Sequence, residues 1–133
     1  MRERRAGAIV NISSVVALIG HVNRVLYAAS KGAVASLTRA MTADHIREGI
    51  RVNAVCLGPT QTPWVDRITI GSGDPERFLE SFRSQLPLGR LATPGEIAET
   101  VAYLASPSAG FMTGALLVVD GEISGVRFVA PAG

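Results

Sequence analysis

The segment YAASKGAVASLTRAMTADHIREGIRVNAVC, Tyr27 to Cys56, predicts a helix that leads directly into a strand. From Tyr27 to Glu48, small and apolar residues recur at helical spacing, and Gly49 then stands where a helix ends. The run Ile50 to Cys56 is mostly apolar, as in a strand that is buried on both faces. A helix that alternates with such a strand is the building unit of α/β proteins.

The flanking segments repeat this alternation. Ala8 to Ile12 (AIVNI) predicts a strand before the helix, and Ala115 to Val119 (ALLVV) predicts another near the end of the chain. Between them, residues 66–85 predict one or two polar helices, and the capping-box sequence from Thr93 to Glu96 starts a further helix. We therefore expect an α/β fold of about three parallel strands with flanking helices and right-handed crossovers, as in half of a doubly wound sheet.

The composition fits one small domain over residues 1–133. Hydrophobic residues make up 47% of the chain, which predicts a core, and the net charge is +2. The basic residues are scattered, which argues against a nucleic-acid surface. The single cysteine, Cys56, excludes an internal disulfide, and no apolar run reaches the length of a membrane span. We expect a cytoplasmic protein that uses neither a metal nor a membrane.

Tyr27 and Lys31 stand four residues apart, on one face of the predicted helix. A free phenol keeps its proton at neutral pH, but a nearby ammonium favours the phenolate and lets the oxygen exchange a proton with a substrate. Ser14 lies thirteen residues before Tyr27, at the end of the first predicted strand, where a hydroxyl can hold a substrate oxygen. The alternative is a surface lysine whose stem packs across an aromatic ring.

The sequence resembles the short-chain dehydrogenase/reductase family over nearly its whole length. The resemblance rests on NISS (Asn11–Ser14), YAASK (Tyr27–Lys31), GIRVNAVCLGPTQTP (Gly49–Pro63), PLGRLATPGEIAETVAYLAS and FMTGALLVVDG. It implies the C-terminal half of a Rossmann fold and an oxidoreductase that interconverts a secondary alcohol and a ketone with NAD or NADP. Two residues depart from the family's pattern: Leu57 stands where a proline is usual, and Glu122 where a second glycine is usual.

The resemblance also implies a role for each candidate site residue. Tyr27 would be the general acid/base, Lys31 would support it and bind the nicotinamide ribose, and Ser14 would align the substrate. The loop after the second predicted strand would contact the nicotinamide, and its candidate cofactor-binding residues are Gly58, Pro59, Thr60 and Thr62. Family members of this kind form homo-oligomers, so a dimer or tetramer is expected.

The substrate is less well defined by the sequence. Arg24, three residues before Tyr27, is either a partner for a substrate carboxylate or a solvated loop residue. Trp64 either lines the substrate pocket or packs elsewhere. The patterns NR-x-x-Y and C-x-G-x-x-x-TP resemble 3-hydroxybutyrate and ketodeoxyfuconate dehydrogenases, which implies a hydroxy acid. Gln85 replaces an arginine of that subgroup, which argues against a carboxylate.

The sequence contains no glycine-rich dinucleotide turn. We therefore expect the chain to be the catalytic half of a longer enzyme, without its N-terminal dinucleotide-binding half, and weak or inactive by itself. A non-catalytic half-domain that acts only as a scaffold or interaction fragment is the alternative.

Overall fold

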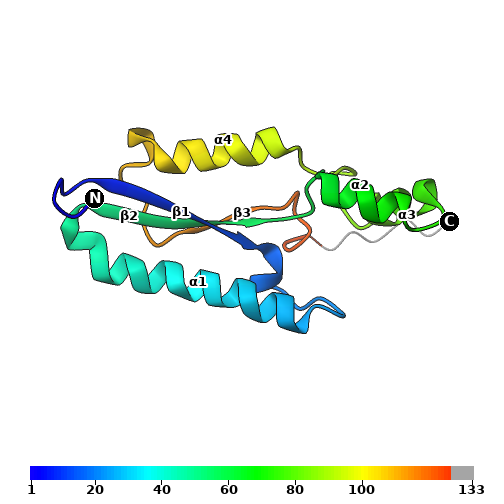
Figure 1. Ribbon diagram of the computed structural model, residues 1–133, viewed down its shortest axis with the longest axis horizontal. Coiled ribbons are helices and arrows are strands. Elements are labelled where there is room, and N and C mark those ends of the chain that lie inside the picture. Colours follow the sequence, from blue (N-terminus) through cyan, green and yellow to red (C-terminus); the bar gives the residue numbers. More distant parts are fainter. Residues whose placement is uncertain (127–133) are drawn as a thin grey trace.

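Three parallel strands form the sheet, in the spatial order β1-β2-β3 (Figure 1). They span Gly7–Ser14 (β1), Ile50–Leu57 (β2) and Leu116–Val119 (β3). β1 pairs with β2 along its whole length, and β3 pairs with the second half of β2. The computed structural model describes residues 1–126, and the α/β arrangement predicted from the sequence is confirmed in them.

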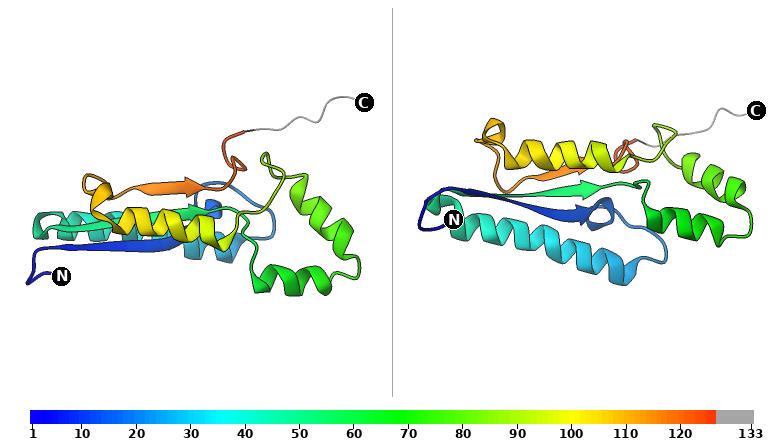
Figure 2. Two further views of the ribbon diagram at one scale, coloured as in Figure 1. Left: turned by 90° about the horizontal axis from the view of Figure 1, so that it is seen from above. Right: turned by 45° about the horizontal axis from the view of Figure 1, so that its top comes forward.

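Helices cover both faces of this sheet (Figures 1 and 2). α1 (Val25–His45) connects β1 to β2 on one face, and α4 (Pro94–Ala105) precedes β3 on the other. α2 (Pro63–Ile70) and α3 (Pro75–Arg83) lie beyond the carboxyl ends of the strands, so they are placed to border a site at that end. Short 3-10 helices are η1 (Val15–Ala17), η2 (Ile46–Glu48) and η3 (Pro107–Ala109).

The two crossovers have opposite hands, which corrects the expectation that both are right-handed. Both connections step across the parallel sheet in the same direction, but α1 and α4 lie on opposite faces of it. The right-handed rule rests on a twisted strand feeding directly into the helix that packs back on the sheet. Residues 58–93 first carry the chain through α2 and α3, beyond the sheet, so α4 is free of that constraint.

The ends of the first two helices follow from local chemistry. α1 starts at Val25, two residues before the predicted start, and η2 continues it to Glu48. Gly49 then adopts a left-handed φ of 72°, which ends the helix as the sequence predicts. α2 starts at Pro63 rather than Asp66, because the Thr62 side chain caps it.

β2 is the centre of the core. Val52, Ala54, Val55 and Cys56 are fully buried between the two helix layers. Asn53 is also buried, and its amide donates to the Met112 carbonyl at 2.9 Å while its oxygen accepts from the Ala115 amide at 3.1 Å. A buried polar side chain with both groups paired ties the start of β3 to the central strand.

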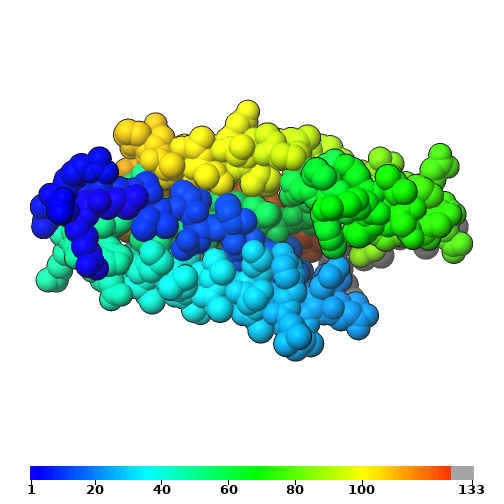
Figure 3. All heavy atoms as spheres, viewed as in Figure 1, coloured from blue at the N-terminus to red at the C-terminus, as the bar shows by residue number. Residues whose placement is uncertain are grey.

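β1 is one edge of the described sheet, and β3 is the other. Among residues 1–126, no strand pairs with its outer side, and its atoms form the molecular surface between α4 and α1 (Figure 3). Ile12 of this strand is 44% exposed. β1 carries no charge, proline or bulge that would protect a natural edge strand. Among the described residues, the outer edge of β1 is therefore uncovered.

Candidate active site

Ser14 is placed by the last pairing of β1 with β2. It is 7% exposed, and its Oγ accepts from the Val16 amide and donates to the Leu57 carbonyl, both at 3.4 Å. These long hydrogen bonds cap η1 and leave the hydroxyl at the carboxyl end of the sheet. The hydroxyl of the preceding Ser13 has a structural role, since its buried Oγ donates to the Lys31 carbonyl at 2.9 Å. This bond fixes α1 against β1.

Tyr27 and Lys31 lie on the first turns of α1. The Lys31 Nζ donates to the Ile12 carbonyl at 3.2 Å and lies 5.8 Å from the centroid of the Tyr27 ring. The lysine is therefore held between the edge strand and the tyrosine. Tyr27 is 46% exposed, which leaves its ring accessible to a ligand.

The loop after β2 brings a second set of groups to the same place. A Cβ at Gly58 would lie 2.6 Å from the Cα of Asp120, so glycine is required where the loop passes the end of β3. The Thr60 hydroxyl donates to the Gly58 carbonyl at 3.1 Å. The Thr62 hydroxyl accepts from the Val65 amide at 3.4 Å, which makes its first role the cap of α2.

One cavity of about 440 Å³ lies where these elements meet. It is lined by eight of the nine residues that the sequence singled out, namely Ser14, Arg24, Tyr27, Gly58, Pro59, Thr60, Thr62 and Trp64. Lys31 is the ninth, and it is not part of the lining, although its Nζ lies 5.8 Å from the centroid of the Tyr27 ring. Parallel strands of this fold type present ligand sites at their carboxyl ends, and this cavity is at that end.

The sequence analysis missed the apolar wall of this cavity. Seven further apolar residues line it: Val15, Val16, Ile19, Leu57, Val65, Phe82 and Ile123. Phe82 comes from α3, which the sequence suggested only as a polar helix. The four-residue spacing of Phe78 and Phe82 was an available signal, because it places both rings on one helix face.

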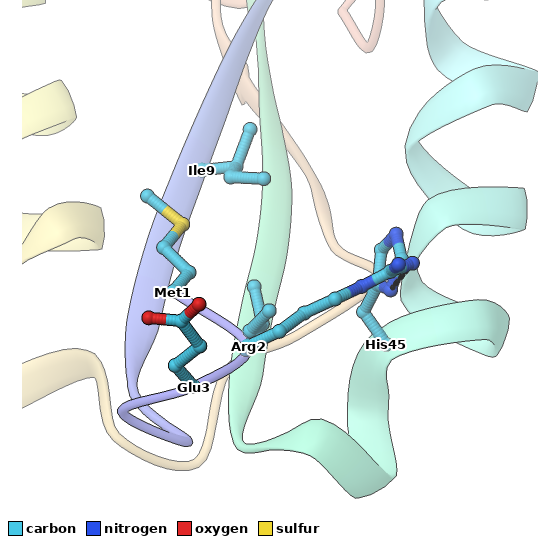
Figure 4. A pocket seen from close by; sticks show the side chains of 6 residues that line it. Met1, Arg2, Glu3, Ile9 and His45 are labelled. Carbon is cyan, nitrogen blue, oxygen red and sulfur yellow. Dashed lines mark hydrogen bonds between the residues drawn. The ribbon is translucent and has the colours of Figure 1, made fainter.

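A second hollow, of about 500 Å³, lies at the opposite end of the molecule. Met1, Arg2 and Glu3 border it near β1, and Arg2 reaches across to His45 of α1 (Figure 4). Arg2 and His45 both pair with the Glu48 carboxylate, at 3.0 and 2.9 Å. Burial raises the pKa of Glu48, but these two partners outweigh it and hold the pKa below its usual value. These ion pairs attach the N-terminal segment and the end of α1 to η2, so we interpret the cluster as structural.

Within residues 1–126, no group of three or more His, Cys, Asp or Glu side chains could hold a metal ion. Burial raises the pKa of the Cys56 thiol, so this side chain serves the core rather than nucleophilic chemistry. In the same part of the chain, no helix is both long and apolar enough to cross a membrane.

Comparison with known proteins identifies the family of the chain. A family model described as enoyl-(acyl carrier protein) reductase matches residues 1–124. A protein named inactive 2-(S)-hydroxypropyl-CoM dehydrogenase 2, from Xanthobacter autotrophicus, is 45% identical over 95% of this chain and 55% of its own length. The 2-keto-3-deoxy-L-fuconate dehydrogenase of Xanthomonas campestris pv. campestris is 42% identical over 91% of this chain and 41% of its own length.

Solved structures give the same result. A putative short-chain dehydrogenase/reductase from Burkholderia xenovorans is 32% identical, with a TM-score of 0.88 over 96% of this chain and 49% of its own. An actinorhodin polyketide ketoreductase crystallised with NADPH is 36% identical, with a TM-score of 0.86 over 93% of this chain and 49% of its own. The chain belongs to the short-chain dehydrogenase/reductase family. It spans about half the length of the curated relatives it matches.

Proposed function

We propose that this chain carries the catalytic residues of an NAD(P)-dependent oxidoreductase that interconverts a secondary alcohol and a ketone. The observation that supports it best is the convergence of Ser14, Tyr27 and the loop after β2 on one cavity, with the Lys31 Nζ 5.8 Å from the centroid of the Tyr27 ring. In the proposed reaction, the nicotinamide supplies or accepts the hydride when it is bound. The proposal covers the activity of the whole enzyme to which these residues would belong.

Each residue has a role that its geometry supports. The Tyr27 hydroxyl passes a proton to or from the substrate oxygen. The Ser14 hydroxyl holds that oxygen by exchanging its long bond to the Leu57 carbonyl for one to the substrate. The Lys31 ammonium has three hydrogens and gives one to the Ile12 carbonyl, so it can also donate to a ribose hydroxyl while its charge supports Tyr27.

The residues of the loop fit one edge of a nicotinamide. Gly58 and Pro59 keep the loop backbone close to the end of the sheet, and Thr60 and Thr62 present hydroxyl groups beside the cavity. We assign these four residues to the nicotinamide end of NAD or NADP. No residue of the cavity is assigned to the adenosine end, so the choice between the two cofactors is left open by this site.

The proposed substrate is a small hydroxy acid or keto acid, with Arg24 as the partner of its carboxylate and Trp64 beside its body. Both residues line the cavity. The names of two relatives support this class, namely the ketodeoxyfuconate dehydrogenase and a cis-4-hydroxycyclohexanecarboxylate dehydrogenase from Sinomonas cyclohexanicum that is 43% identical. The proposed assembly is a homo-oligomer through α1, on which Leu26 and Leu37 are 86% and 52% exposed.

NADH titration of the purified chain, followed by NADH fluorescence, tests the nicotinamide site. Saturable binding that is weaker in Lys31→Ala and unchanged in Phe111→Ala would support the proposal, since Phe111 is fully exposed and outside the cavity. No binding up to millimolar cofactor would contradict a nicotinamide site in this chain by itself.

A non-catalytic interaction fragment is the second candidate. The uncovered edge of β1 supports it, and so does the name of the 45% identical relative, which describes that protein as inactive. The same titration separates the candidates, because an interaction fragment has no reason to bind NADH at the Tyr27–Lys31 pair.

A further inference from the structure

The cavity beside Tyr27 is lined by side chains of two chemical kinds. Ser14, His21, Arg24 and Tyr27 are polar, and a larger apolar set includes Phe82 and Ile123. None of the described lining residues is acidic. Within residues 1–126, the Arg24 guanidinium makes no ion pair or side-chain hydrogen bond. The cavity therefore combines an available cation with an apolar wall.

Phe82 is supported from behind by another aromatic ring. It lies near the end of α3, and its ring centroid is 5.3 Å from that of Phe78 at a tilt of 44°. Aromatic pairs in this range attract one another beyond the area they bury. Phe82 lines the cavity and α3 has no fully buried residue, so a ligand in the cavity can cover apolar surface of Phe82.

Ile123 is held in the wall by a turn after β3. The Asp120 carboxylate accepts from the Ser124 amide at 3.0 Å and from the Glu122 amide at 2.9 Å. This turn directs Ile123 onto the cluster of Val65, Leu86 and Leu91. The apolar wall thus includes residues of α2, α3 and the turn after β3. Phe78 supports Phe82, and the cluster of Val65, Leu86 and Leu91 supports Ile123.

We propose that Phe82 and Ile123 form a subsite for the hydrocarbon body of the substrate, and that Phe82 sets the size of body that is preferred. The ligand class is a carboxylate with a hydrocarbon ring or branched chain, whose anionic end lies at Arg24. This inference rests on the proposed function for the identity of the site, but it concerns binding alone. An acid that carried no apolar body would leave the wall exposed to water and would bind weakly.

The sole tryptophan of the chain, Trp64, lines the cavity and provides the measurement. Its fluorescence is followed while the purified chain is titrated with cyclohexanecarboxylate, acetate and neutral cyclohexanemethanol, in the absence of any nucleotide. We expect cyclohexanecarboxylate to bind at least about tenfold more tightly than acetate, because only it covers the apolar wall. It should also bind more tightly than cyclohexanemethanol, because only the acid pairs with Arg24.

Variants of Phe82 and Arg24 test the apolar contact and the carboxylate contact separately. Phe82→Ala and the milder Phe82→Leu should reduce the preference for cyclohexanecarboxylate over acetate, about fivefold and about twofold respectively. Arg24→Gln should reduce the preference for the acid over the neutral alcohol. Phe111→Ala is the matched control and should change neither ratio, because Phe111 lies outside the cavity.

Equal binding of the two acids, unchanged selectivity in both Phe82 variants, or no saturable binding of any acid would overturn the subsite. Circular dichroism of each variant verifies that it is folded. Failure of the proposed oxidoreductase function is seen separately, in the NADH titration, because the acid titrations contain no cofactor.

Discussion

The Lys31 ammonium nitrogen lies 5.8 Å from the centroid of the Tyr27 ring, one turn further along α1. The same nitrogen is anchored to the Ile12 carbonyl of β1, so the position of the charge is set by the sheet as well as by the helix. A fixed positive charge beside the ring stabilises negative charge that develops on the phenol oxygen during proton transfer. The pair is therefore preorganised for proton transfer at the Tyr27 oxygen, although only Tyr27 borders the cavity.

Replacing Lys31 should separate its effect on ligand binding from its effect on folding. Lys31→Met retains the aliphatic stem but loses the charge and the donors, so we expect NADH affinity to fall about tenfold. The melting temperature should change little, because the bond to Ile12 is exposed. Lys31→Arg should retain part of the affinity. If the methionine and arginine variants bind NADH as the parent chain does, Lys31 has no role at the nicotinamide.

Glu122 should be a strained residue whose replacement by glycine stabilises the protein. Its φ is 67°, in the left-handed region that a side chain disfavours by about 1–2 kcal/mol. Glycine removes this strain but adds freedom to the unfolded chain, so Glu122→Gly should raise the free energy of unfolding by about 0.5–1 kcal/mol. Glu122→Ala retains the strain and serves as the control in urea unfolding. An equal gain in both variants would point to charge instead.

Glu96 should make the stability of the chain depend on acid pH. Its hydrogen bonds from Arg90, and then those from the Thr93 backbone and side chain, lower its pKa from 4.5 to about 2. Because the folded pKa lies below the unfolded one, this stabilisation is complete above about pH 5 and is lost as pH falls from about 4.5 towards 2. Glu96→Gln keeps a side chain for the capping box but loses the charge.

Thermal unfolding across pH 2–7 measures the effect. We expect the melting temperature of Glu96→Gln to lie below that of the parent near pH 7, with the difference closing as the solution is acidified. Glu99→Gln, on the same helix, provides a comparison at a carboxylate that forms none of these bonds. A difference between parent and Glu96→Gln that stays constant down to pH 2 would contradict the assignment.

The fold was largely predictable because its local signals agree with its tertiary contacts. Gly49 marks the end of the first helix, the Thr93 capping box marks the start of α4, and the apolar run of β2 is fully enclosed. That Ser14 and Tyr27 would lie at one site was also predictable, because Ser14 ends a strand and Tyr27 lies at the start of the next helix, and the two line one cavity. We could not predict the opposite hands of the crossovers, which depend on how a long connection leaves the sheet.

The apolar wall of the cavity was missed for a similar reason. Phe82 and Ile123 are 41 residues apart in the numbering, and only the folded chain brings them together. Ile123 lies in a segment with no periodic pattern, and its place is set by the hydrogen bonds of Asp120. The sequence showed only that Glu122 stands where a glycine is usual. The positive φ of Glu122 in the structure shows that this residue is strained.

The buried amide of Asn53 should contribute more to stability than any other asparagine of the chain. It is 1% exposed, and it bonds both to the Met112 carbonyl and to the Ala115 amide. Asn53→Ala leaves both backbone groups without this partner inside the core, at a cost of about 2–4 kcal/mol. Asn11→Ala is the matched control, since Asn11 is only partly buried and donates one bond, to the Thr38 hydroxyl at 3.0 Å.

Urea unfolding of the two variants tests this ranking. Asn11→Ala should cost about 1 kcal/mol, the usual net value of one hydrogen bond, so the midpoint of Asn53→Ala should be clearly the lower. The dependence of the free energy on urea should be the same in both, because neither substitution changes the surface that unfolding exposes. Equal midpoints would mean that β3 is held by its pairing with β2 alone, and that the amide of Asn53 fills space without fixing the strand.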